Sequence, residues 1–411
     1  MSLIHPFRGL RPRADLSTRV PSLPYDVMSS AEARQMAEGN AETFLHVIKP
    51  EIDLDPGIDL YDDRVYAQGV QNLRRFMAEG ILVPDPEPCL YLYSQRMGDH
   101  EQFGIMACAS AAEYDADLIK KHEHTRADKE ADRTRHVDDT SANAGPVFLT
   151  YRASADIDRL VADVARRAPD VDFTADDAIG HTLWVIRDRL TIDGLVGAFS
   201  AVEALYVADG HHRSASAAAV ARRRREANPD HTGDEEYNFF LAVLFPHDQL
   251  QILDYNRVVK DLGDHSPESL IAAIGEKFEV TPTTDPKPTR VHDFAMYLDR
   301  TWYRLTAREG TYPAVDPVAS LDVAVLQDNL LAPLLGIGDP RKDRRVDFVG
   351  GIRGLDGLER RCDQGWAVAF ALHPTTIDQL LGVADAGLIM PPKSTWFEPK
   401  LRSGLVVHLL E

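Results

Sequence analysis

Cysteine is scarce in this sequence. The three cysteines, Cys89, Cys108 and Cys362, are far apart in a chain of 411 residues, and none belongs to a CxxC pair. Their odd number and wide spacing argue against a disulfide framework. A reducing compartment, the cytoplasm, is therefore the expected location.

Long apolar runs and an excess of positive charge are also missing. No run approaches the 18 apolar residues of a membrane span, and the N-terminus lacks the apolar region of a signal peptide. The formal net charge is −20. So acidic a surface repels polyanions and argues against general nucleic-acid binding, although a local pocket can still hold a small anion. We therefore expect small-molecule ligands, without a nucleic-acid or membrane partner.

The composition is that of a globular protein, with 44% hydrophobic and 27% charged residues. Helical and strand patterns are mixed along the chain, which predicts the α/β (mixed α+β) class. A boundary is expected between Gly263 and Pro267, so that residues 1–264 form a first part and residues 265–411 a C-terminal α/β part. Predicted elements include a helix within 29–40, a strand at 43–51, a helix from 63 to Gly80, adjacent strands at 88–97 and 101–114, a strand at 204–209 and a helix from Ser214.

The first motif with chemical potential is "DGHHR", Asp209 to Arg213. Gly210 permits a tight turn out of the strand, and the helix that follows presents free N–H groups to an anion such as phosphate. Arg213 adds a planar donor fork, the histidines can bind phosphate or carry a proton, and Asp209 would hold Mg²⁺ or orient a histidine. The alternative is a capped helix with a solvated polar end.

The second motif is "KHEHTRADKEADR", Lys121 to Arg133. On a helix, Thr125, Lys129 and Asp132 or Arg133 share one face. A carboxylate beside cations suits a general base or a phosphate-bearing substrate. The alternatives are a solvated helix with ion pairs, or a metal site at residues 122–124, for which the HExxH spacing is absent.

The third motif is "MPPKSTWFEPKLRSGL", residues 390–405. Its anion-binding side chains include Lys393, Ser394, Thr395 and Lys400, and Trp396 and Phe397 would stack on a base or shield a pocket. The alternative is an ordered C-terminal tail. Weaker candidates to border a pocket are "FRGLRPR", residues 7–13, and "LPYDV", residues 23–27. The sequence contains no GxSxG, GxGxxG or Walker A loop.

The order of these motifs resembles a known family. "FRGLRP", "PYDV", "HE-x-T", "DGHHR" and "MPPKSTWFEPKLRSGL" follow one another as in domain-of-unknown-function family 1015, and the resemblance covers nearly the whole chain. In addition, "VADGHHR" is similar to the phosphate-binding strand–turn–helix of the ParB and sulfiredoxin superfamily. That resemblance implies a ParB/sulfiredoxin-like nucleotide-binding core in residues 1–264.

The free serine kinases of that superfamily carry a very similar "DGHHR" and use an upstream glutamate as base. By this resemblance we expect a phosphotransferase that moves a phosphoryl group from ATP or ADP, with Mg²⁺, to a small hydroxylated metabolite, with free serine as the candidate acceptor. The expected catalytic residues are Glu123, His212 and Asp209, with Asp209 also the Mg²⁺ ligand. The expected nucleotide-binding residues are Gly210, His211, His212, Arg213, Ser214, Lys393, Ser394, Thr395 and Lys400. The expected substrate-binding residues are His122, Thr125, Lys129 and Arg133.

Two other functions fit the same sequence. A metal-dependent hydrolase would use His122, His124, His211, His212 and Asp209 to hold a metal and an activated water. A non-catalytic regulator would bind a nucleotide at the same turn without converting it. The sequence does not indicate an oligomeric state.

Overall fold

The computed structural model describes residues 4–411 and divides the chain into two compact units. The first comprises Met1–Leu250 and Pro399–Glu411, and the second comprises Gln251–Glu398. The boundary expected at 264/265 thus lies within the second unit, and the last thirteen residues return to the first. Both units mix helices and sheets, which confirms the predicted α/β (mixed α+β) class.

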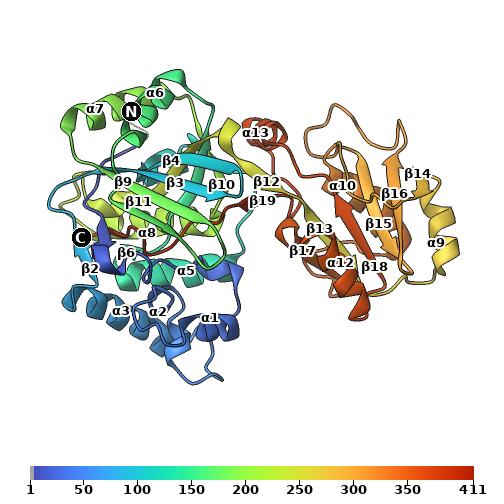
Figure 1. Ribbon diagram of the computed structural model, residues 1–411, viewed down its shortest axis with the longest axis horizontal. Coiled ribbons are helices and arrows are strands. Elements are labelled where there is room, and N and C mark those ends of the chain that lie inside the picture. Colours follow the sequence, from blue (N-terminus) through green and yellow to red (C-terminus); the bar gives the residue numbers. More distant parts are fainter. Residues whose placement is uncertain (1–3) are drawn as a thin grey trace. The chain divides into compact units, whose positions relative to one another are not determined.

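The first unit is built on an eight-stranded sheet (Figure 1). In spatial order its strands are β5 (Ile119–Lys120), β10 (Leu205–Asp209), β7 (Val147–Tyr151), β11 (Phe239–Pro246), β4 (His100–Ser110), β3 (Leu90–Met97), β9 (Gly180–Ile186) and β8 (Val171–Thr174). The β10–β5 and β11–β7 pairs are parallel and the other pairs are antiparallel. Two small ribbons pair β1 (Leu10–Pro12) with β2 (Leu82–Pro84), and β6 (Ala142–Asn143) with β20 (His408–Leu409).

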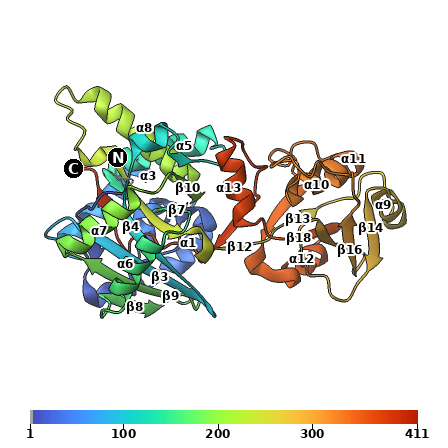
Figure 2. The same ribbon diagram turned by 90° about the horizontal axis from the view of Figure 1, so that it is seen from above.

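Helices pack on this sheet and on one another. α6 contacts β3 and β9, α8 contacts β7 and β11, and α5 lies beside α8 (Figure 2). Buried apolar residues of the strands and of α6, α7 and α8 form one core, which fixes the position of α8 on the sheet. The helices are α1 (Ser30–Ala37), α2 (Leu45–Ile48), α3 (Asp63–Ala78), α4 (Ala111–Asp115), α5 (Ala127–Thr140), α6 (Ala155–Ala165), α7 (Arg189–Phe199) and α8 (His211–Ala227).

The second unit has its own six-stranded sheet and core. In spatial order its strands are β14 (Phe278–Pro282), β16 (Thr301–Ala307), β15 (Asp293–Leu298), β18 (Val368–Leu372), β13 (Tyr255–Val259) and β17 (Val346–Gly350). A short ribbon joins β12 (Gln251–Leu253) to β19 (Trp396–Glu398). The helices are α9 (Pro267–Ile274), α10 (Asp322–Leu326), α11 (Ala332–Leu335), α12 (Gly354–Asp363) and α13 (Ile377–Asp385). Within residues 4–411, none of the helices has the length and apolar character needed to cross a bilayer.

Several sequence predictions are confirmed and others are wrong. Ser29 caps α1 through a capping box, and the strands predicted at 88–97 and 101–114 pair as neighbours. The second of these strands ends at Ser110, because its hydroxyl accepts a hydrogen bond from Glu113 N–H and starts α4. The strand predicted at 43–51 is wrong: this segment forms α2 and a 3₁₀ turn, because its apolar side chains pack on α3.

His136 of α5 gives the first testable prediction. Its ring is buried, its Nε2 lies 2.9 Å from the Val47 carbonyl oxygen, and burial, followed by the charge of Arg133, lowers its pKa to about 4 despite the opposing charges of Asp132 and Glu51. Below pH 6.5 the unfolded chain therefore binds a proton that the folded chain does not bind. The free energy of unfolding consequently decreases as the pH is lowered from 6.5 to 4.

We expect His136 to account for about 2 kcal/mol of the stability lost between pH 7 and pH 5. The urea transition of the first unit, measured at both pH values, checks this. The His136→Gln variant retains an amide donor for the Val47 carbonyl oxygen but has no titratable ring. Its loss of stability between pH 7 and pH 5 should therefore be smaller than that of the wild type by about 2 kcal/mol. An equal loss in both proteins would contradict the assigned pKa.

Candidate functional site: the β10–α8 turn

The turn between β10 and α8 leaves the start of a helix open. Gly210 adopts φ +94, which favours glycine, and α8 begins at His211, three residues before the start predicted from sequence. The N-cap residue of α8 is Gly210 itself, which has no side chain to accept a capping hydrogen bond. The first backbone N–H groups of a helix have no partner within it and carry a partial positive charge, so the turn presents a donor set for an anion.

Asp209, the last residue of β10, is held by two cations. Lys400 donates to Asp209 Oδ2 at 2.9 Å, and Arg213 Nη2 lies 3.8 Å from Oδ1. Burial alone would raise the pKa of Asp209, but the charges of Lys400 and Arg213 outweigh it and hold the pKa below its usual value. Both carboxylate oxygens face cations in this structure, and the predicted role of Asp209 as a Mg²⁺ ligand stays a prediction. The structure does bring Lys400 to this turn, as the sequence had suggested.

Arg213 folds back beneath the turn. It donates to the Pro146 carbonyl oxygen, and its Nη2 lies 3.7 Å from Asp26 Oδ2. Its Nε is buried and has no hydrogen-bond partner. Asp26 belongs to the "PYDV" segment, which the sequence identified only as a weak pocket candidate. Its place in the order of motifs that resembles family 1015 was the other signal.

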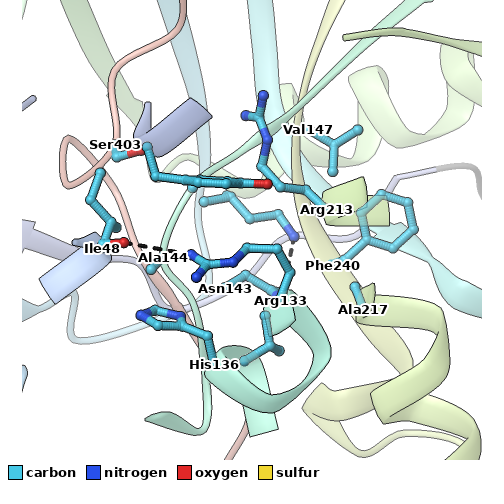
Figure 3. A pocket seen from close by; sticks show the side chains of 14 residues that line it. Ile48, Arg133, His136, Asn143, Ala144, Val147, Arg213, Ala217, Phe240 and Ser403 are labelled. Carbon is cyan, nitrogen blue, oxygen red and sulfur yellow. Dashed lines mark hydrogen bonds between the residues drawn. The ribbon is translucent and has the colours of Figure 1, made fainter. Parts of the chain in front are cut away.

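A small cavity lies beside Arg213 (Figure 3). Its volume is about 40 Å³, enough for a few water molecules but far too small for a nucleotide. Arg133, a predicted substrate-binding residue, stacks on the Tyr25 ring at 4.3 Å and pairs with Asp132 at 2.8 Å. The remaining lining residues are Ile48, His136, Val137, Asn143, Ala144, Gly145, Val147, Ala217, Phe240, Leu241 and Ser403.

His122, Glu123 and His211 meet beside the turn. The two histidine rings are buried and lie edge to face, with centroids 4.5 Å apart. Glu123 Oε2 is 4.0 Å from His211 Nδ1. The structure thus brings the predicted base, Glu123, to the predicted phosphate turn.

Of the five residues predicted as metal ligands for a hydrolase, only His122 and His211 belong to this cluster. His124 is exposed, and His212 Nε2 accepts a hydrogen bond from Arg126 N–H at 3.0 Å. Asp209 is paired with Lys400. The predicted five-residue set is therefore not assembled in this structure.

Three further predicted residues make local contacts in the first unit. Thr125 donates to Glu130 at 2.5 Å, and Lys129 donates to the Tyr61 hydroxyl at 3.1 Å. Ser214 is buried, and its hydroxyl bonds back to the His211 carbonyl oxygen at 3.1 Å. The Ser214 side chain therefore stabilises the first turn of α8, and its predicted role in nucleotide binding stays a prediction.

Lys393, Ser394 and Thr395 belong to the second unit. Lys393 lies over the Tyr255 ring at 5.6 Å, and the Ser394 hydroxyl donates to the Pro391 carbonyl oxygen at 2.6 Å. Their predicted role at the nucleotide stays a prediction.

The family comparison matches residues 4–324 with "Protein of unknown function (DUF1015)". The chain belongs to this family. The match includes the turn at Gly210, Glu123 and the PYDV segment, and ends before Lys400. No curated protein matches the sequence.

Solved structures with partial similarity to this DUF1015 chain include a free serine kinase in complex with AMP, with 12% identity, a TM-score of 0.36 and coverage of 74% of this chain and 92% of that one. A conserved hypothetical protein from Pyrococcus furiosus has 12% identity, a TM-score of 0.35 and coverages of 73% and 93%. SbnI with a C-terminal truncation, from Staphylococcus aureus, has 12% identity, a TM-score of 0.38 and coverages of 74% and 87%. At these TM-scores the similarities carry no argument about the site.

The ion pair at the base of the turn gives a second prediction. Lys400→Met removes the closest cation from Asp209, so a partly buried carboxylate keeps only Arg213. In a double-mutant cycle with Asp209→Asn we expect a coupling of about 1–3 kcal/mol in the free energy of unfolding. The control Lys129→Met, which changes a lysine that donates to the Tyr61 hydroxyl in the same unit, should show no coupling with Asp209→Asn. A Lys400 coupling as small as this control would contradict the assignment.

Proposed function

We propose that the protein is a phosphotransferase that moves a phosphoryl group from ATP or ADP to a small hydroxylated metabolite, with free serine as the first acceptor to test. The observation that carries the proposal is the start of α8 at a left-handed Gly210, with Glu123 and Arg213 beside it. A helix start of this kind binds phosphate through backbone N–H groups and its partial charge.

Each group at the turn has one task in this proposal. The N–H groups at the start of α8 hold the transferable phosphate, with His212 beside them at the first turn of the helix. Arg213, fixed by Asp26 and Asp209, supplies positive charge beneath the turn, which stabilises the negative charge of the transferring group. The Glu123 carboxylate accepts the proton of the attacking hydroxyl. Asp209 faces Lys400 and Arg213, so in this proposal a Mg²⁺ ion that accompanies the nucleotide is held mainly by phosphate oxygens and water.

The reaction itself gives the third prediction. Phosphorus NMR of the chelator-treated protein with Mg²⁺, ATP or ADP, and L-serine should show a new phosphomonoester signal that requires serine. Glu123→Gln should reduce its rate by about 10²-fold or more, since general-base catalysis contributes that much. Glu226→Gln, an exposed glutamate near the far end of α8, should leave the rate unchanged.

Two results would redirect the proposal. Hydrolysis of the donor without the serine-dependent signal would support phosphoryl transfer by this protein but would show that serine is not the acceptor. Nucleotide binding without turnover of any donor would contradict the kinase assignment and favour the regulatory alternative.

Nucleotide affinity gives the fourth prediction. Arg213→Met should weaken ADP binding about tenfold or more, since a charge-assisted contact contributes about 1.5–3 kcal/mol. Calorimetric titration measures the change, Arg222→Met on the exposed face of α8 is the matched control, and circular dichroism verifies the fold. An unchanged affinity for ADP in a folded Arg213→Met variant would show that the phosphates bind elsewhere.

A further inference from the structure

The sheet topology places three metal-ligating side chains at one point. β5 and β10 are parallel neighbours, with Ile119 opposite Leu205. His122 and Glu123 follow the end of β5, and His211 follows the end of β10. Because carboxyl ends of parallel strands share one edge of a sheet, these residues are close although about 90 positions separate them. One ligand atom from each lies within 4.8 Å of the others.

The two histidines have buried nitrogen atoms that are weakly satisfied. His122 is 2% exposed and His211 is 6% exposed. Nε2 of His211 has no hydrogen-bond partner within residues 4–411, and the His122 ring makes no hydrogen bond of ordinary geometry there, although the Val207 backbone lies close enough to act on it. Buried polar atoms in folded proteins nearly always have a partner, so these weakly satisfied nitrogens in one cluster indicate that a ligand completes their bonding.

The chemistry of the three groups selects the kind of ligand. His122 and His211 each offer imidazole nitrogens, which are common ligands of transition metals, and both rings are buried in the cluster. Glu123 adds a carboxylate that is 40% exposed. Two imidazoles and one carboxylate suit zinc, cobalt, iron or manganese, whereas Mg²⁺ and Ca²⁺ prefer oxygen ligands alone.

We infer that His122, His211 and Glu123 bind one divalent transition-metal ion of the zinc class beside the β10–α8 turn. Tetrahedral bonds of about 2.0–2.1 Å place ligand atoms about 3.3 Å apart, so the cluster contracts by roughly 1.5 Å at its widest pair when it binds. Glu123, whose side chain is 40% exposed, would make most of that movement. Three protein ligands leave at least one coordination position for water or a substrate oxygen.

This site goes beyond the proposed phosphotransferase and does not depend on it. The two do share Glu123, since a carboxylate oxygen bound to a metal cannot also accept a proton. Transition-metal occupancy and phosphoryl transfer therefore compete for this residue, and the kinase assay above uses chelator-treated protein for that reason. Metal binding is measured without nucleotide, so the metal site and the phosphotransferase activity can each be disproved independently of the other.

The test uses the full chain, stripped with a chelator and titrated with Co²⁺. We expect one equivalent to bind with visible absorption bands typical of Co²⁺ bound by protein ligands, Zn²⁺ to displace it, and Mg²⁺ in excess not to displace it. Glu123→Gln should weaken Co²⁺ binding by about tenfold or more, by analogy with the cost of perturbing metal-site groups. His124→Asn, the exposed neighbour, is the matched control and should bind as the wild type does.

The half-exposed Glu123 is the primary variant, because a substitution of buried His122 or His211 risks the fold. His122→Asn is a second variant, to be used once circular dichroism shows that it folds. Three outcomes would overturn the site: no visible Co²⁺ bands, equal displacement by Mg²⁺, or the same loss of affinity in His124→Asn as in Glu123→Gln.

Discussion

The ion pair between Lys400 and Asp209 is the interaction on which the rest of the site depends. It joins the C-terminal segment of the chain to the end of β10, over 191 positions of sequence. Arg213 extends it to Asp26 and to the Pro146 carbonyl oxygen, so four distant segments meet beneath one glycine turn. Buried charges are tolerated only when they are paired, and this pairing fixes the backbone that opens the start of α8.

The two sides of the turn differ in charge. Beneath Gly210 lie two cations and two carboxylates in mutual contact. Beside it lie the buried rings of His122 and His211 and the partly exposed Glu123. A helix start that attracts anions thus stands next to a donor set that suits a metal. The donor set follows from the parallel pairing of β5 with β10, in a sheet whose other pairs are largely antiparallel, whereas the helix start follows from the glycine turn at the end of β10.

Local patterns predicted the strand at 204–209, the turn and the helix after it, because glycine and the change of hydrophobic period are local signals. Lys400 was predicted to bind the nucleotide because it lies in a C-terminal motif rich in anion-binding side chains. Local patterns did not show that Lys393 and Lys400, seven residues apart, fall in different units, since the return of the chain after Glu398 is set by long-range packing. They also misassigned residues 43–51, where burial against α3 outweighs strand propensity. The burial and proximity of the His122 and His211 rings could not be predicted, because they depend on the pairing of strands that are distant in the sequence.

The central claim is that the start of α8 at Gly210 is a phosphate site. A crystal structure of the protein grown with ADP tests it most directly. The account predicts phosphate oxygens within hydrogen-bond distance, about 2.7–3.2 Å, of the backbone N–H groups of His211 and His212, with the Lys400–Asp209 pair intact beneath them. ADP bound with its phosphates on any other element, and no anion at the start of α8, would contradict it.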